Sequence, residues 1–171
     1  MEKGLPFSGS VTLSDSAAGV EAVYELSRGG EVPFRRLSDG RVEVPLSYET
    51  NDGRLLLFLK HRIASVDVAV EPVKLSPCLA SGEKSIAPGD AISVTMTVRD
   101  ETGSAVPARL PVEIRVFDAD GRELDGAGYA CADGGVCRLT VRTNLNDAPG
   151  GYRVVCRDRA SGIESVVRTS K

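Results

Sequence analysis

The stretch AISVTMTVR at residues 91–99 sets apolar side chains at every second position. Ile92, Val94, Met96 and Val98 alternate with Ser, Thr and Arg residues. Successive side chains of a β-strand point to opposite faces, so this period of two predicts a strand with one face toward a core and one toward water. The β-branched residues in the stretch also favour a strand over a helix.

The same alternation recurs along the chain. Expected strands cover residues 10–14, 21–27, 31–37, 41–48, 54–60, 64–73, 90–99, 110–117, 136–143, 151–158 and 163–169, with a weaker one at 122–130. Turn-forming pairs separate them, at Asp39-Gly40, Asp52-Gly53, Asp120-Gly121 and Gly134-Gly135. We find no apolar stripe with a helical period of 3.6 residues. The sequence therefore predicts an all-β chain.

A domain boundary is expected near residues 61–64. Residues 1–62 are predicted to form a small antiparallel β unit. Residues 63–171 carry the series of short strands and turns that is typical of an immunoglobulin-like β-sandwich. The segment 74–90 between two of these strands is expected to be a long loop.

One run departs from the alternation. Leu55 to Leu59 reads LLLFL without a polar position. A continuous apolar run predicts a strand that is buried on both faces. We expect one face to fill the core of the first unit and the other to be covered by the second unit or by a neighbouring module.

The overall charge limits the partners. The 171 residues include 21 Lys and Arg, 24 Asp and Glu, and a net charge of −3. This acidic balance argues against a general polyanion-binding surface, so no nucleic-acid partner is expected. No apolar run approaches the roughly 18 residues that a membrane-spanning helix needs, so no membrane span is expected. Residues 1–10 lack the apolar core of a secretion signal.

Turn and strand motifs of the second unit match a known pattern. The stretch 86–123, IAPGDAISVTMTVRDETGSAVPARLPVEIRVFDADGRE, with DAPGGYRVVC at 147–156, resembles bacterial immunoglobulin-like domains. It is also similar to the second macroglobulin-type domain of the α2-macroglobulin family. The matching positions are Pro88-Gly89, Asp100, Gly103, Val106-Pro107, Asp118, Asp120-Gly121, Pro149-Gly150 and Tyr152.

A second resemblance concerns the first unit. VYELSRGGEVPF (23–34) with GRVEVPLSYETNDGRLLLFL (40–59) looks like the end of C-terminal β-sandwich modules in large secreted bacterial glycoside hydrolases. Such modules are generally non-catalytic. The two resemblances imply a structural or spacer accessory module of a larger secreted or cell-surface bacterial protein, extracellular or periplasmic, whose partners are neighbouring domains of the same parent chain. Its secretion signal is then expected upstream of this segment.

The four cysteines leave several pairings open. Cys131 and Cys137 flank the residues ADGGV, and a three-residue loop at 133–135 would place them directly opposite each other on neighbouring strands. Directly opposite residues have Cα atoms about 4.5–5.5 Å apart, a distance that a disulfide accepts. Cys131 and Cys137 are therefore the disulfide candidates. The alternatives are a bridge from Cys156 to Cys78 or Cys137, and four free thiols. No spacing fits a zinc site.

Residues for catalysis and metal binding are few. His61 is the single imidazole and is expected to be structural or exposed at the domain junction. No nucleophile motif or phosphate-binding loop occurs, so we expect no catalytic residue and no cofactor. Asp118-Ala-Asp120-Gly begins like a calcium loop without its later ligands, and Asn144, Asn146 and Asp147 form a second oxygen-rich loop. We interpret both as turns and expect no metal.

Carbohydrate binding is the alternative function. Sugars commonly stack on exposed aromatic rings. The chain has no Trp, four Tyr and four Phe, and most of these rings are expected in or beside the two cores. The sequence thus favours a non-catalytic spacer, with a carbohydrate-binding or adhesive module as the alternative.

Overall fold

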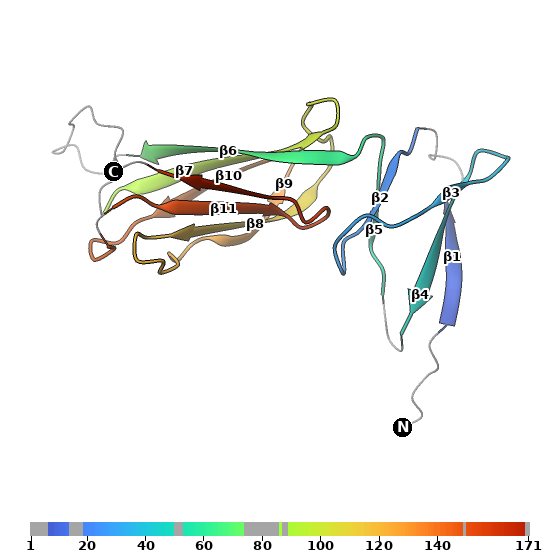
Figure 1. The fold of residues 1–171 in the computed structure, drawn as a ribbon, viewed down its shortest axis with the longest axis horizontal. Coiled ribbons are helices and arrows are strands. Elements are labelled where there is room, and N and C mark those ends of the chain that lie inside the picture. The colour runs from blue at the N-terminus through green and yellow to red at the C-terminus, as the bar shows by residue number, and fades with distance from the viewer. Residues whose placement is uncertain are drawn as a thin grey trace, which may run out of the picture. The chain divides into compact units, whose positions relative to one another are not determined.

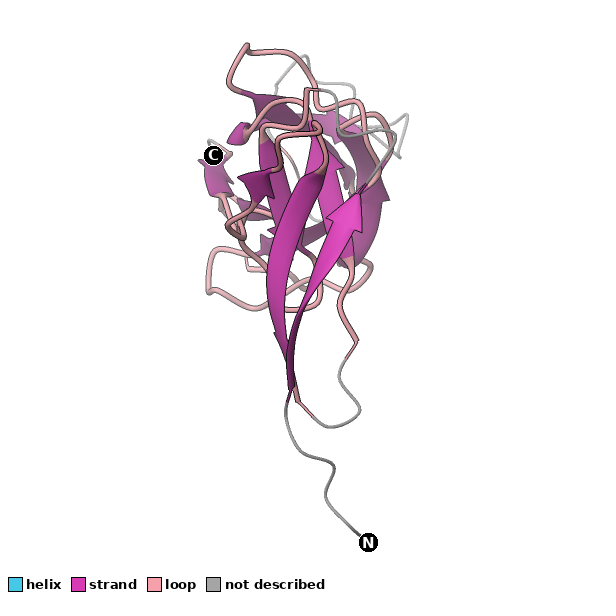
Figure 2. Ribbon diagram, turned by 90° about the vertical axis from the view of Figure 1, so that its right-hand side faces the viewer, coloured by secondary structure: helices cyan, strands magenta, loops and turns pink. Residues whose placement is uncertain are grey.

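The chain is described by a computed structural model, which covers residues 7–13, 19–49, 53–73, 86, 89–148 and 150–169, with Phe7 described by its backbone alone. These residues form strands and turns and contain no helix (Figure 2). The prediction of an all-β chain of antiparallel strands is confirmed. Backbone contacts divide the chain into two compact units, residues 1–62 and residues 63–171.

The first unit combines a three-stranded and a two-stranded sheet (Figure 1). Its strands are β1 (Phe7–Leu13), β2 (Ala22–Glu25), β3 (Arg35–Arg36), β4 (Val42–Tyr48) and β5 (Leu56–Leu59), in the orders β1-β4-β3 and β2-β5. Of the strand expected at 31–37, only β3 is formed. Val23 of β2 packs with Val42, Val44 and Leu46 of β4 in the core of this unit.

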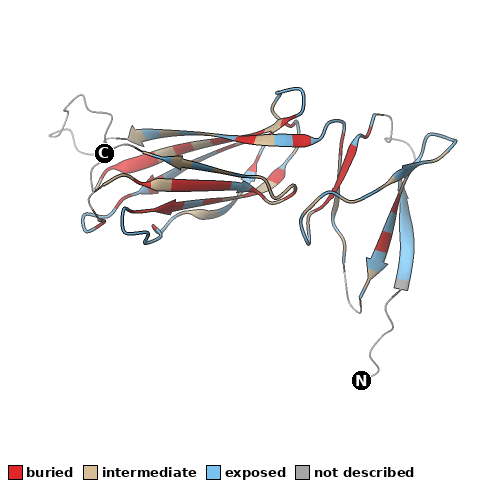
Figure 3. Ribbon diagram, viewed as in Figure 1, coloured by how far each residue is buried: buried red, intermediate tan, exposed pale blue. Residues whose placement is uncertain are grey.

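The core of the first unit is open along β1. Residues 8–12 are all exposed, and β1 is pale blue in Figure 3. Val11 lies opposite Val44 in the ladder and therefore shares its face of the sheet. Val44 is completely buried, whereas Val11 is 39% exposed. The described strands therefore cover the inward face of β4 and leave that of β1 open to solvent.

Within this chain, the run from Leu55 to Leu59 is not buried on both faces, and its cover by a neighbouring module stays a prediction. Leu55 is 62% exposed, and Leu59 is the one residue of the run in the buried class. Leu56 and Phe58 are partly buried against the core of the first unit. The reason is the sheet itself, because β5 pairs only with β2 among the described strands and lies at a sheet edge rather than in its middle.

The second unit has the layers of a β-sandwich. Its strands are β6 (Ile63–Val73), β7 (Ala91–Asp100), β8 (Leu110–Phe117), β9 (Gly128–Ala132), β10 (Val136–Arg142), β11 (Arg153–Asp158) and β12 (Glu164–Arg168). A three-stranded sheet has the order β10-β7-β6, and a four-stranded sheet has the order β12-β11-β8-β9. Of the segment expected at 74–90, the structure describes only Ile86, Gly89 and Asp90.

The interior of the second unit follows the alternation in the sequence. Val94, Met96 and Val98 of β7 are completely buried, and so are Ile114 of β8 and Val154 of β11. These strands are red along their inward positions in Figure 3. The two sheets thus enclose a filled apolar core, in contrast to the open first unit.

The chain crosses the second unit from end to end. Strand β6 starts at Ile63 and runs along the unit (Figure 1). The last strand, β12, packs beside β6, and the residues around its end, Val167 to Thr169, lie next to Val70 and Pro72. At about 3.3 Å per residue, these positions are about 25 Å along β6 from Ile63. The chain therefore enters and leaves this unit at opposite ends.

Candidate functional site

Three buried aspartates stand where strands of the second unit end. Asp100 is the last residue of β7, Asp118 follows β8, and Asp158 is the last residue of β11. Their exposed fractions are 5%, 5% and 0%. Buried carboxylates require hydrogen-bond partners, and all three find them in the turn that follows.

Asp100 illustrates the arrangement. Its Oδ1 accepts hydrogen bonds from the backbone N–H of Thr102 at 2.9 Å, from the Thr102 hydroxyl at 2.6 Å and from the backbone N–H of Ser104 at 3.1 Å. Gly103 has a φ of 83°, in the left-handed region that favours glycine. Asp158 repeats the pattern with Ser161, whose N–H and hydroxyl both donate to Oδ2. These carboxylates therefore cap turns.

Asp118 caps the turn that follows β8. Its Oδ1 accepts from the backbone N–H groups of Asp120 at 3.1 Å and Arg122 at 2.8 Å, and its Oδ2 accepts from that of Ala148 at 3.4 Å. Burial alone would raise the pKa of Asp118. The backbone donors and the Arg122 guanidinium outweigh burial and lower this pKa below its ordinary value. Asp118 is therefore an ionised structural group at neutral pH.

Arg122 joins the two oxygen-rich loops that the sequence singles out. Its guanidinium lies 3.5 Å from Asp118 Oδ2 and 3.1 Å from Asp147 Oδ1. Both carboxylates are buried, with 2% and 1% of the side chain exposed. An arginine of the chain itself thus lies where the two loops meet and balances their charge. Among the described residues, no three His, Cys, Asp or Glu side chains are grouped so that they could hold a metal ion.

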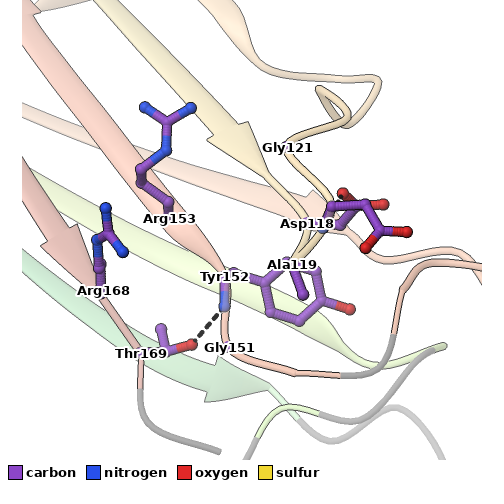
Figure 4. A pocket seen from close by; sticks show the side chains of 9 residues that line it. Asp118, Ala119, Gly121, Gly151, Tyr152, Arg153, Arg168 and Thr169 are labelled. Carbon is purple, nitrogen blue, oxygen red and sulfur yellow. Dashed lines mark hydrogen bonds between the residues drawn. The ribbon is translucent and has the colours of Figure 1, made fainter.

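An open pocket of about 450 Å³ lies beside the Asp118 turn (Figure 4). It is lined by Asp118, Ala119, Asp120, Gly121, Gly151, Tyr152, Arg153, Arg168 and Thr169. The residues come from the turn after β8, the start of β11 and the end of β12. The backbone N–H of Tyr152 donates to Thr169 Oγ1 at 2.8 Å, which ties β11 to the end of β12 at the pocket wall.

Gly151 is required at this wall because the segments before β11 and after β12 approach each other closely. A Cβ atom at this position would lie 2.2 Å from the carbonyl oxygen of Thr169. Tyr152, the next residue, is buried with 2% exposure, and its hydroxyl makes no well-aligned hydrogen bond to any residue that the structure describes. Burial raises the pKa of Tyr152 and nearby Asp147 adds to the effect, while Thr143 acts against it. Tyr152 therefore stays protonated at neutral pH.

Two arginines face each other across the strands at this pocket. Arg153 of β11 and Arg168 of β12 are direct register partners. The Arg153 guanidinium lies over the Phe117 ring, 3.9 Å from its centre. Arg115 contacts the same ring at 4.8 Å but is neutralised by Glu123, with which it forms two hydrogen bonds. Within the described ranges, neither Arg153 nor Arg168 forms a salt bridge with a carboxylate.

His61 is not part of this pocket. It is exposed in the short connection between β5 and β6, and the lining of the pocket does not include it.

The hairpin between β9 and β10 differs from the expected one. Asp133 and Val136 pair across a two-residue turn, Gly134-Gly135, instead of a three-residue loop. Both glycines have positive φ, 56° and 76°, as the tightest hairpin turns require. Beyond this turn, β9 pairs with β8 in the four-stranded sheet and β10 pairs with β7 in the three-stranded sheet, so Cys131 and Cys137 do not lie opposite each other on neighbouring strands.

The described cysteines differ in their surroundings. Cys131 is exposed, Cys137 and Cys156 are buried, and all three are free thiols in the structure. Burial raises the pKa of Cys156 to about 12, and nearby Cys137 adds to the shift. Cys78 lies outside the described residues, so its pairing with Cys156 stays a prediction. A bridge between Cys131 and Cys137 also stays a prediction, and it requires an arrangement of β9 and β10 other than the one found.

Aromatic rings are mostly covered. Tyr129 of β9 is 76% exposed and is the one ring in the exposed class among the described aromatic side chains. Tyr24 and Tyr152 are each only 2% exposed. Phe117 is 7% exposed, and the guanidinium groups of two arginines lie over its ring. The described surface thus offers a single ring to a stacking ligand.

Two features of the structure are missing from the sequence-based prediction. One is a buried ion pair of the first unit, between Arg54 and Glu25 at 3.0 Å, with side chains 5% and 8% exposed. The other is the Arg153–Arg168 pair. Both join residues far apart in the chain, so only the register of the strands reveals them. The repeated Asp-x-x-Gly sequence at 100–103 and 118–121, by contrast, is a visible signal for the capped turns.

No model of a known protein family matches this chain, and no curated protein matches it either. Across the residues that the structure describes, no helix has the length and apolar character needed to cross a membrane. The function has to be inferred from the geometry of the two units.

Proposed function

We propose that the chain is a non-catalytic structural module that holds neighbouring domains of a larger protein at a fixed separation. The observation that carries the proposal is the path through the second unit. The chain enters at Ile63 and leaves after β12 beside Val70 and Pro72, about 25 Å along β6. A unit whose two ends lie apart separates whatever precedes it from whatever follows it.

The ladders of the second unit are oriented to resist a pull on these ends. β6 pairs with β7 along nearly its whole length, from Ile63 opposite Asp100 to Val73 opposite Ala91. β12 pairs with β11 in the same antiparallel manner. A force along β6 and β12 therefore loads both ladders in shear, so that many hydrogen bonds must break together.

The buried acids also support a non-catalytic role. A general acid or base must be free to exchange a proton with substrate. Asp100, Asp118 and Asp158 instead accept hydrogen bonds from their own turns, and Asp147 binds Arg122. These carboxylates therefore stabilise the conformation of the loops.

The wider identity that we propose follows the resemblances in the sequence. The second unit would be an immunoglobulin-like or macroglobulin-type domain, and its three-plus-four strand arrangement agrees with that assignment. The parent would be a secreted or cell-surface bacterial protein, such as a glycoside hydrolase, and the partners would be its other domains. A carbohydrate-binding or adhesive module is the alternative, and the pocket at Arg153 and Arg168 is the observation that favours it.

Single-molecule force spectroscopy tests the spacer function. Handles at the two ends of the second unit, before Ile63 and after Thr169, pull along β6 and β12. We expect a single unfolding step with a gain in contour length of roughly 350 Å, from about 3.3–3.6 Å per released residue. Gradual extension at low force would contradict the proposal.

The matched control pulls the same unit in another direction. Handles at residues 63 and 101 lie at one end of the β6–β7 ladder, because Ile63 is opposite Asp100. This geometry opens the ladder one hydrogen bond at a time. The proposal predicts a clearly lower unfolding force than in the first geometry, and equal forces would count against it.

A further inference from the structure

The outward face of the β11–β12 pair contains one mismatched position. Its three outward cross-strand pairs are Arg157 with Glu164, Val155 with Val166, and Arg153 with Arg168. The first pair combines opposite charges and the second combines apolar groups. The third places like charges directly opposite each other, which destabilises a sheet. Packing within the chain does not explain this pair.

One arginine of the mismatched pair is also held in place. Arg153 rests on the Phe117 ring at 3.9 Å, and Phe117 is its register partner on β8. Thr169, next to Arg168, is fixed by its hydrogen bonds with Tyr152. The Arg153 guanidinium, fixed on the ring, loses little freedom when a ligand binds and is therefore prepared for an anion.

The opposite wall of the pocket offers a hydrogen-bond acceptor. Asp120 lines the pocket, and within the described residues its carboxylate makes no hydrogen bond or ion pair. The backbone N–H of Asp120 is already used by Asp118. Thr169 Oγ1 accepts from Tyr152, so the hydroxyl can still donate its proton. The lining of the pocket therefore combines two guanidinium groups, the Asp120 carboxylate and the Thr169 hydroxyl.

We propose that this pocket binds a small carboxylic acid that also carries hydrogen-bond donors. The carboxylate would lie between Arg153 and Arg168, because guanidinium groups bind carboxylates through two parallel hydrogen bonds. Hydroxyl or ammonium donors of the ligand would reach Asp120. This chemistry is shared by hexuronic acids and α-amino acids.

The size of the pocket agrees with such a ligand. Its volume of about 450 Å³ falls in the range of small-molecule sites. Gly121 and Gly151 contribute walls without side chains, so a ligand can approach the backbone closely. Ligand binding here adds to the spacer function and does not depend on it.

A titration of the isotope-labelled full chain, followed by amide NMR shifts, tests the proposal. The probes are D-galacturonate, L-alanine, D-galactose and acetate. We expect D-galacturonate or L-alanine to shift the amides of residues 119–121, 151–153 and 168–169. D-Galactose lacks the carboxylate and acetate lacks the donors, so both should bind at least about tenfold more weakly. A response to D-galacturonate alone identifies the sugar acids, and a response to L-alanine alone identifies the amino acids.

Substitutions on one face of the sheet provide the controls. Arg168→Ala should weaken binding roughly 10- to 100-fold, because a charge-assisted hydrogen-bond pair is lost. Arg168→Glu should abolish binding while keeping the fold, since it places opposite charges at the mismatched position. Arg157→Ala, on the same strand as Arg153 but outside the pocket, should leave the affinity unchanged.

Three results would overturn the proposal. The first is equal binding of acetate and D-galacturonate, which would mean unspecific anion attraction. The second is loss of affinity in Arg157→Ala as large as in Arg168→Ala. The third is the absence of shifts at these residues with all four probes at millimolar concentration.

Discussion

The two units are built from the same kinds of strand and turn, but they bury their apolar cores to different degrees. Both consist of short antiparallel strands joined by Asp-Gly turns. In the second unit, the inward side chains of β7 and β8 are completely buried, whereas in the first unit β1 is exposed along residues 8–12. An alternating sequence therefore predicts a strand, but closure depends on whether a second sheet is wide enough to cover it.

The units also differ in how they use buried charge. The first unit contains the Arg54–Glu25 ion pair, and Arg54 also donates to the carbonyl oxygen of Ser47 at 2.7 Å. The second unit buries aspartates such as Asp100 and Asp158 as turn caps. We infer that the buried ion pair adds to the stability of the small apolar core in the first unit, whereas the second unit depends on apolar packing with capped turns.

The largest expected effect is in the first unit. Arg54→Ala leaves Glu25 buried without its cation, which costs about 3–5 kcal/mol of unfolding free energy. Local unfolding measured by hydrogen exchange in β2 and β4 checks this. As a control, Arg35→Ala removes an ion pair with Glu43 whose arginine is 72% exposed, and should cost much less unfolding free energy than Arg54→Ala. Equal losses in the two variants would show that burial of the Arg54 pair contributes nothing.

The second prediction compares the two cores. Ile114→Ala in the second unit creates a cavity among completely buried side chains and should cost about 2–5 kcal/mol. Val11→Ala in the first unit removes a side chain that is 39% exposed, and should cost less than about 0.5 kcal/mol. Denaturant unfolding measures both. A large loss for Val11→Ala would mean that β1 is covered in solution.

The third prediction compares the turn caps. Asp100→Ala leaves the backbone N–H groups of Thr102 and Ser104 without their acceptor, at a cost of about 1–3 kcal/mol. Asp39→Ala removes a similar contact to Arg41 in the first unit, but Asp39 is half exposed, so water replaces the lost acceptor. Thermal unfolding should show a much smaller change for Asp39→Ala, and the reverse order would refute the role of burial.

The fourth prediction concerns reactivity and involves no loss of stability. All four cysteines lie in the second unit. Cys131 should be alkylated in the native protein, whereas Cys137 and Cys156 should react only after unfolding, because burial raises the pKa of both thiols. Peptide mapping by mass spectrometry distinguishes them. If Cys131 and Cys137 react only after a reductant is added, they form the predicted disulfide, and β9 and β10 are arranged differently from the structure.

The strands could be predicted where alternation is strong. Residues 110–117 form β8 as expected, and 91–100 forms β7 within one residue of the expected bounds. The strand expected at 31–37 shrinks to β3, and the apolar run at 55–59 lies at a sheet edge. Burial of a strand depends on the neighbours that the fold supplies, and a local pattern does not contain that information.

The pocket could not be predicted because it depends on register. Arg153 and Arg168 look like ordinary outward residues until β11 and β12 are aligned. The turn at 118–121 was visible as an oxygen-rich motif, but Arg122 as its partner was not. At residues 133–136, a two-residue turn joins strands of two different sheets, so Cys131 does not face Cys137. A site whose residues come from different strands therefore cannot be predicted from the local sequence pattern.

Native-state hydrogen exchange across the whole chain tests most directly whether the second unit is a closed sandwich and the first unit is open. The account predicts that amides of β7, β8 and β11 exchange only through global unfolding of the second unit. Amides of β1 should exchange through local opening, orders of magnitude faster. Protection in β1 as strong as in β8, or rapid exchange in β7 and β11, would contradict it.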